Sequence, residues 1–102
     1  MKRSKRYAQY KRDVRKHTAR VAPVRFGTTR DHIVPVSFGF KHDIPADLIG
    51  SKRNLEYMSL NDNIQKGQRM TPLGIDVLRF WALLYNEPRY RDLADVYEAK
   101  IK

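Results

Sequence analysis

The first twenty residues place apolar side chains at helical spacing among many basic ones. Tyr7, Tyr10 and Val14 follow one another at intervals of three and four residues, which puts them on one face of a helix. We therefore expect residues 1–20 to form a basic helix or a partly ordered arm, docked on the body by its tyrosines. Residues 21–30 contain proline, glycine and threonine, which predicts a linker.

The middle of the chain carries shorter apolar runs. Residues 33–36 are β-branched around Pro35, which predicts a short strand that the proline ends. Residues 37–53 hold glycine, proline and scattered apolar side chains, and this pattern predicts a long loop packed on its own apolar residues.

A second strand and a short helix are predicted next. Residues 55–60 can form the partner strand. Ser59 or Asn61 can cap a helix that runs to Lys66, because both side chains accept hydrogen bonds from free backbone N–H groups. Gly67 follows as a helix stop.

The last third of the chain predicts two helices that act as scaffold. Thr71 and Pro72 combine a capping hydroxyl with a proline at the first helical position. This helix should run to about Asn86 and end before Pro88, and a final helix should cover residues 91–100. Their expected apolar faces consist of Leu73, Val77, Leu78, Trp81, Leu84 and Tyr85, and of Leu93, Val96, Tyr97 and Ile101.

Positive charge is concentrated at the N-terminal end. The chain has 21 Lys and Arg against 11 Asp and Glu, a net charge of +10. Residues 1–30 hold eleven of the basic residues and one acid, so residues 31–102 are balanced. Nucleic acid is the expected partner, because each phosphate contact releases condensed counterions, although a solvated tail or one that meets acidic lipid has the same composition. The expected contact residues are Lys2, Arg3, Lys5, Arg6, Lys11, Arg12, Arg15, Lys16 and Arg20.

Length and composition exclude several classes. The 102 residues fit one compact domain. The absence of cysteine excludes disulfides and thiolate zinc sites. No apolar run approaches the roughly 20 residues that span a bilayer, and the basic N-terminus lacks the apolar segment of a secretory signal. We expect a soluble, cytoplasmic protein without a membrane partner.

One segment carries side chains suited to metal chemistry. Asp31 and His32 are adjacent, so a hard oxygen ligand and an imidazole base diverge from one point of the backbone. Asn63 and Lys66 are three residues apart and share one face of the short predicted helix. Carboxylate and amide oxygens suit Mg²⁺ or Mn²⁺ better than Zn²⁺.

This segment resembles the HNH (ββα-metal) nucleases. The matching residues are Asp31-His32-Ile33-Val34-Pro35, Gly39, Asn54-Leu55, Met58, Asn63 and Lys66. Asn63 and Lys66 stand nine and twelve residues after Asn54, the spacing of that family. The resemblance covers about a third of the chain, and short proteins of this kind are often encoded by phages or mobile elements.

The resemblance implies a role for each residue. Asp31 and Asn63 would hold one Mg²⁺ or Mn²⁺, with no structural zinc. His32 would be the general base that activates water, and Asn54 would hydrogen-bond across the loop and keep the base oriented. Lys66 would offer positive charge to the phosphate. The implied activity is hydrolysis of DNA phosphodiester bonds, most simply in duplex DNA.

The expected fold class is therefore α+β. A small ββα-metal core over residues 31–70 would follow a basic arm and linker over 1–30, and two scaffold helices over 71–102 would pack on that core in one compact domain.

Alternatives remain open at this stage. Asp31 can cap a turn, His32 can be a satisfied, half-buried histidine, and Asn61 competes with Asn63 as a ligand. His42 is expected to be a solvated loop histidine. The chain could also be a catalytically silent HNH-like module that binds nucleic acid or a partner protein, or an RNA-associated protein.

Overall fold

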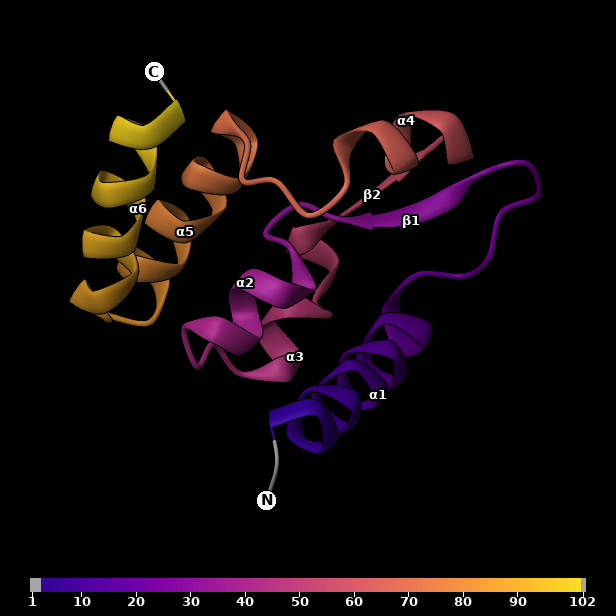
Figure 1. Cartoon of the computed structure of the whole chain (residues 1–102), viewed down its shortest axis with the longest axis horizontal. Coiled ribbons are helices and arrows are strands. Elements are labelled where there is room, and N and C mark those ends of the chain that lie inside the picture. The colour runs from indigo at the N-terminus through magenta and orange to yellow at the C-terminus, as the bar shows by residue number, and fades with distance from the viewer. Residues whose placement is uncertain (1–2, 102) are drawn as a thin grey trace.

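The computed structural model describes residues 3–101, and the side chains of residues 4–101, as a mostly helical α+β fold. This confirms the predicted fold class. Helices α2 and α3 lie at the centre, with α1 on one side, the pair α5 and α6 on another, and a two-stranded sheet with α4 at the far end (Figure 1). The elements are α1 (Arg3–Val21), β1 (Thr29–His32), α2 (Val36–Lys41), α3 (Ala46–Ile49), the 3₁₀ turn η1 (Lys52–Asn54), β2 (Leu55–Met58), α4 (Leu60–Lys66), α5 (Pro72–Leu84) and α6 (Pro88–Ile101).

Helix α1 packs on the central helices through the predicted apolar stripe. Val14 is 1% exposed, and the Tyr10 hydroxyl donates to the backbone oxygen of Ile44 at 2.6 Å. The ring of Tyr7 lies 4.9 Å from that of Phe40. The docking prediction is confirmed, and α1 is part of the packed fold rather than a detachable arm.

The first strand lies four residues earlier than predicted. Ile33 still donates its N–H to the backbone oxygen of Asn54 at 2.8 Å. The next N–H, of Val34, bonds the side-chain oxygen of Asn54 instead, and Pro35 has no N–H, so the ladder stops. The strand predicted over 33–36 is therefore wrong, because its apolar side chains are buried by core packing and not by strand pairing.

The loop predicted over 37–53 is also wrong, since α2, α3 and η1 occupy it. Pro35 and Pro45 stand at the N-caps of α2 and α3. Gly39 lets α2 approach α3 closely, because a Cβ there would lie 2.6 Å from Cγ1 of Ile49. Helices this short complete too few turns to show a hydrophobic period in the sequence.

The capping signals of the second half give the helix starts correctly. The Ser59 hydroxyl accepts from the N–H of Asp62 at the start of α4, and Gly67, with a φ of 58°, ends that helix. The Thr71 hydroxyl accepts from the N–H of Gly74 at the start of α5. Strand β2 also lies within the predicted segment, beginning directly after η1.

Helices α5 and α6 pack against each other, with the Trp81 and Tyr90 rings 6.2 Å apart. Helix α5 ends at Leu84, earlier than predicted, and α6 begins at Pro88, because proline is tolerated in a first helical turn. The predicted apolar faces are partly wrong. The exposed members of those faces are Leu73, Leu84, Tyr85, Val96 and Ile101.

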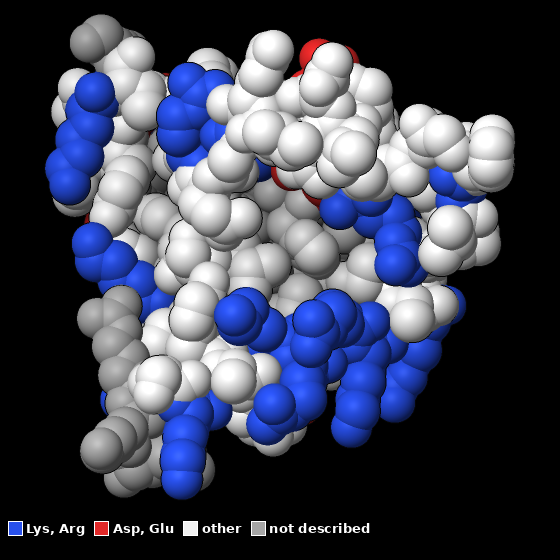
Figure 2. All heavy atoms as spheres, turned by 45° about the vertical axis from the view of Figure 1, so that its right-hand side comes forward, with Lys and Arg blue, Asp and Glu red and all other residues white. Residues whose placement is uncertain are grey.

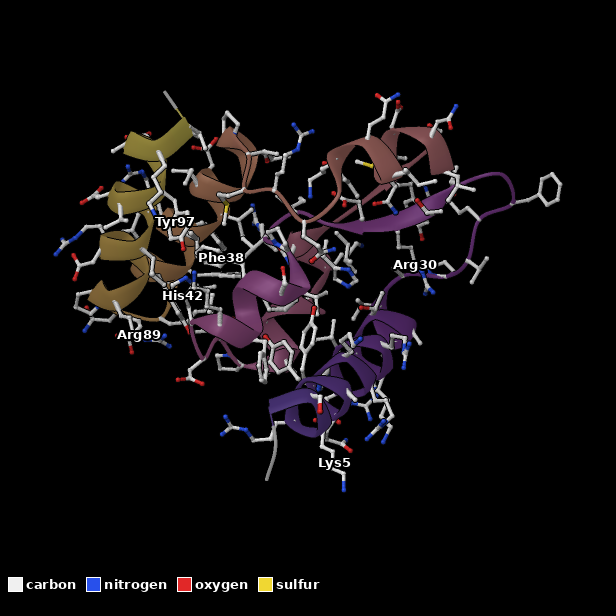
Figure 3. The ribbon with its side chains drawn as sticks, viewed as in Figure 1. Lys5, Arg30, Phe38, His42, Arg89 and Tyr97 are labelled. Atoms are coloured by element: carbon white, nitrogen blue, oxygen red, sulfur yellow. The ribbon has the colours of Figure 1, made fainter. Side chains whose placement is uncertain are left out.

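A ring cluster joins α2 to α6 (Figure 3). The His42 imidazole and the Tyr97 hydroxyl are 3.0 Å apart, and the Phe38 ring lies 4.8 Å from that of Tyr97. Arg89 donates to the backbone oxygens of His42 and Asp43. His42 is therefore a packed cluster member and not the solvated loop histidine expected from the sequence.

Among the described helices, none has the length and apolar character needed to cross a membrane.

Candidate functional site

Strand β1 presents the candidate site residues on two faces. Side chains alternate along a strand, so Thr29 and Asp31 share one face while Arg30 and His32 share the other. The first face lies against α4, and the second faces the C-terminal part of α1, where Arg30 donates to the backbone oxygen of Ala22 at 2.8 Å (Figure 3). The adjacent Asp31 and His32 thus work on opposite sides of one strand.

Hydrogen bonds on the α1 side of β1 select one tautomer of the His32 imidazole. Its Nε2 atom lies 3.0 Å from the hydroxyl oxygen of Thr18. That hydroxyl donates its own proton to the backbone oxygen of Val14 at 2.9 Å, so it accepts from the imidazole. Nε2 therefore carries the ring proton, and Nδ1, which meets no partner in the described part of the chain, keeps a free lone pair.

The surroundings of His32 favour its neutral form. Burial lowers the pKa of His32 from its ordinary value near 6.5 to about 4, and the positive charges of Arg30 and Lys66 act in the same direction. The imidazole is therefore neutral at physiological pH, which is the form that can accept a proton.

Asp31 is buried on the α4 side with one oxygen engaged. Its Oδ1 lies 3.2 Å from the Lys66 ammonium, while Oδ2 is buried and has no hydrogen-bond partner within residues 4–101. Burial raises the pKa of Asp31, and the Lys66 charge only partly offsets that effect. A buried carboxylate oxygen without a partner is costly, so Oδ2 is the feature of this site that most needs a ligand.

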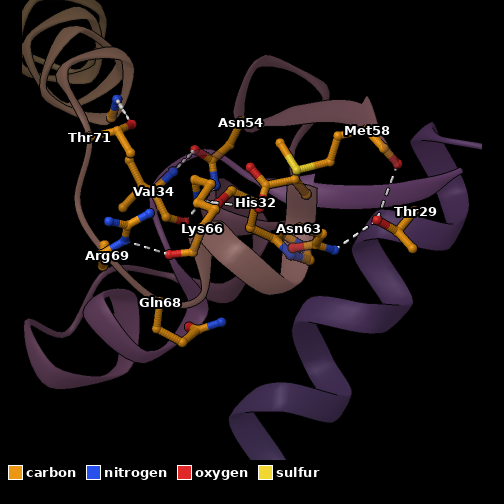
Figure 4. Close-up of polar contacts among 12 residues, drawn as sticks. Thr29, His32, Val34, Asn54, Met58, Asn63, Lys66, Gln68, Arg69 and Thr71 are labelled. Carbon is orange, nitrogen blue, oxygen red and sulfur yellow. Dashed lines mark hydrogen bonds and ion pairs between the residues drawn. The ribbon is translucent and has the colours of Figure 1, made fainter. Parts of the chain in front are cut away.

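Asn63 approaches the same face of β1 from α4. Its Nδ2 donates to the Thr29 hydroxyl at 2.8 Å, and that hydroxyl in turn donates to the backbone oxygen of Met58 at 3.4 Å (Figure 4). Within residues 4–101, Oδ1 of Asn63 has no hydrogen-bond partner, and neither has the buried Oδ2 of Asp31. Across residues 4–101 no three His, Cys, Asp or Glu side chains cluster. Carboxylate and amide oxygens are donors that suit Mg²⁺ or Mn²⁺, which retain several waters.

Asn54 clamps the backbone that follows His32. It is fully buried, and its side chain accepts from the N–H of Val34 at 2.7 Å and donates to the oxygens of Val34 and Ile49 at 3.0 and 2.9 Å. The predicted role was a bond that keeps the base oriented. The Asn54 side chain instead bonds Val34, two residues after His32, so it fixes the end of β1 and not the imidazole itself.

Lys66 is engaged with β1. Besides Asp31, its ammonium bonds the backbone oxygen of His32 at 3.2 Å, and the side chain is 12% exposed. It therefore neutralises the buried carboxylate. Asn61, the competing ligand, is exposed on α4.

A cavity of about 540 Å³ opens beside His32, between α1 and β1. Arg15 of α1, Arg25 of the connecting loop and Arg30 of β1 line it. Thr18, Thr28 and Thr29 are also among its lining residues. Figure 2 shows Lys and Arg side chains gathered below a hollow on one face of the molecule. Guanidinium donors around an open space suit phosphate oxygens.

A larger cavity, of about 800 Å³, lies between α1 and the turn from α2 to α3. It contains none of the candidate catalytic or metal-ligating residues, and its lining mixes Arg6 and Lys41 with Asp13 and Asp43. Acids repel phosphate, so the smaller cavity is the better site for nucleic acid.

The basic residues expected to meet DNA are exposed along α1, where they are described. They are Lys5, Arg6, Lys11, Arg12, Arg15, Lys16 and Arg20. Lys2 and the side chain of Arg3 lie outside the described residues. Among these basic residues, Arg15 reaches the cavity beside His32.

Three residues of the site were missed from the sequence. Thr18 stands one helical turn after Val14, so extending the apolar stripe would have placed it on the buried face. Thr29 and Arg30 were assigned to the linker because the strand was predicted too late.

Comparison of the chain with known protein families, curated proteins and solved structures found no match.

Proposed function

We propose that this chain is a metal-dependent endonuclease of the HNH type that hydrolyses DNA phosphodiester bonds. The observation that carries the proposal is a neutral, proton-accepting His32 at an arginine-lined cavity, with the buried, unpartnered Oδ2 of Asp31 on the opposite face of β1. The order of β1, β2 and α4 is also the order that the resemblance implies.

The proposed metal ligands are Oδ2 of Asp31 and Oδ1 of Asn63. Both are oxygen donors, which fits the choice of Mg²⁺ or Mn²⁺. When bound, the ion supplies a Lewis acid that stabilises the charge developing on the phosphate and on the leaving oxygen.

The chain's own groups account for the remaining chemistry. Nδ1 of His32 takes a proton from a water whose oxygen forms the new bond to phosphorus, and the bond from phosphorus to the leaving sugar oxygen breaks. Arg15 and Arg30 hold the anionic backbone in the cavity. A phosphate there offsets the nearby positive charges, which moves the His32 pKa upward and makes the base stronger in the complex.

A plasmid assay tests this proposal. Purified protein is incubated with supercoiled DNA and Mg²⁺ or Mn²⁺, beside His32→Ala and a matched control, His17→Ala, on α1. We expect cleavage by the wild type and the control, and a loss of about 100-fold or more in His32→Ala. Equal cleavage, or none at all, by wild type and His32→Ala across metals and salt concentrations contradicts the proposal.

The second candidate is a catalytically silent module that binds nucleic acid. The Lys66 ammonium on Asp31 favours it, because an internal cation already neutralises that carboxylate. This function predicts salt-sensitive DNA binding that ignores metal and survives His32→Ala. Metal-dependent cleavage that this substitution abolishes eliminates it.

A further inference from the structure

The loop between α1 and β1, residues 22–28, is held against the sheet at its start and at Arg25. Arg30 and the Tyr57 hydroxyl donate to backbone oxygens near its start, those of Ala22 and Pro23. The Arg25 guanidinium lies over the Tyr57 ring, 3.7 Å from its centroid. These contacts fix the loop against the sheet.

The tip of this loop carries an aromatic side chain that the fold does not use. The hydroxyl and N–H of Thr28 both donate to the backbone oxygen of Arg25, which closes a tight turn over residues 25–28. Gly27 supplies the positive φ, 80°, that this turn requires. Phe26 is 105% exposed, and Val24 on the same loop is 78% exposed. The turn therefore presents Phe26 wholly to solvent from a rigid base.

The surroundings indicate what Phe26 can meet. Val24 and Arg25 line the cavity that contains His32, together with Arg15 and Arg30. A phenylalanine that follows Arg25, on a loop whose base lines a cavity with three guanidinium groups, is poorly suited to an apolar protein surface, which would leave those charges unpaired. It suits nucleic acid, which pairs phosphates with arginines and offers flat base faces for stacking.

We propose that Phe26 stacks on a base of DNA bound in this cavity, at a step that is kinked or unpaired. The inference rests on the proposed function only in taking DNA as the partner. An intact duplex must open a step to admit the ring, and a bulge or a mismatch lowers that cost. The loop thus gives the protein a preference for DNA that is already distorted near the bound phosphate.

Binding without cleavage tests the stacking directly. Fluorescence anisotropy in EDTA compares wild type, Phe26→Ala and Phe26→Tyr on a bulged duplex, with Leu83→Ala as the control at another exposed apolar residue, on α5. We expect Phe26→Ala to bind roughly 5- to 100-fold more weakly and the other two variants to match wild type. The salt dependence of Phe26→Ala should stay unchanged, because its phosphate contacts remain. Affinity within twofold of wild type overturns the proposal and leaves a protein partner as the occupant of this tip.

A second variant reports the contact itself. Phe26→Trp adds an exposed indole to a chain whose own Trp81 is buried, so a change in emission on DNA binding comes from the loop. Stacking should quench that emission at saturating DNA, and unchanged emission overturns the proposal. Neither measurement depends on hydrolysis, so a protein that binds in this way but never cleaves refutes the nuclease while the stacking stands. A nuclease whose Phe26→Ala variant binds normally refutes the stacking alone.

Discussion

The hydroxyl oxygen of Thr18, on α1, lies 3.0 Å from Nε2 of His32, on β1. The most basic helix of the fold therefore also holds the candidate general base. Because the Thr18 proton is committed to Val14, the contact selects one tautomer of the imidazole and leaves Nδ1 for chemistry.

Replacing Thr18 should shift that tautomer. Thr18→Val keeps the shape but removes the acceptor, so we expect His32 to populate both tautomers and plasmid cleavage to fall about tenfold. Thr18→Ser keeps the acceptor and should retain the single tautomer and the cleavage activity of wild type. Nitrogen-15 chemical shifts of the imidazole report the tautomer without any need for activity. An unchanged tautomer in Thr18→Val means that this hydroxyl does not position the ring.

Removing the Asn54 clamp should destabilise the fold. Asn54→Ala leaves the N–H of Val34 and two backbone oxygens buried without partners, at a cost of about 3 kcal/mol or more in the free energy of unfolding. Asn61→Ala, at an exposed position on α4, is the matched control and should change it little. Urea denaturation of both variants measures the difference, and similar midpoints contradict the assigned role.

Metal should substitute for the Lys66 ammonium. In Lys66→Met the Oδ1 atom of Asp31 loses its cation, so we expect a lower melting temperature that Mn²⁺ raises by more than it raises that of wild type. The combination with Asp31→Asn should abolish that gain, and Lys52→Met, on η1, is the control. If Mn²⁺ shifts all four proteins alike, Asp31 is not a ligand.

Acid should weaken the fold through its histidines. Burial lowers the pKa of His42 below its ordinary value near 6.5, and Lys41, Arg89 and Lys100 add to that effect while Asp43 opposes it. The unfolded chain therefore binds the proton first, so the free energy of unfolding falls as pH drops below about 6.5. His42→Gln should flatten this dependence in urea titrations at pH 7.5 and 5, leaving the part due to His32. An identical slope in the variant argues that His42 titrates normally.

Charge substitutions on α1 should weaken DNA binding without unfolding the protein. Arg15, Lys16 and Arg20 are exposed, whereas Val14 and Thr18 are buried, so deleting the helix would disrupt the fold as well as the surface. Changing the three basic residues to Gln should reduce the slope of log affinity against log salt by about 2 to 3. A slope equal to that of wild type shows that DNA binds elsewhere.

Local signals in the sequence were sufficient for the starts of α4 and α5 and for the docking stripe of α1. Ser59 and Thr71 cap the helices that follow them because capping depends on residues three positions apart. The strand over 29–32 could not be found in this way. Its residues are polar, and what ends it is the side chain of Asn54, more than twenty positions away.

By itself the sequence determined the α+β class, the charge on the first helix and the set of side chains able to serve a metal. Those properties depend on composition and on neighbours within a few positions. Only the tertiary structure decided which oxygens are open, which imidazole nitrogen is free and that Phe26 stands in solvent. Each of those outcomes depends on hydrogen bonds or packing between segments distant in the chain, and no local pattern records them.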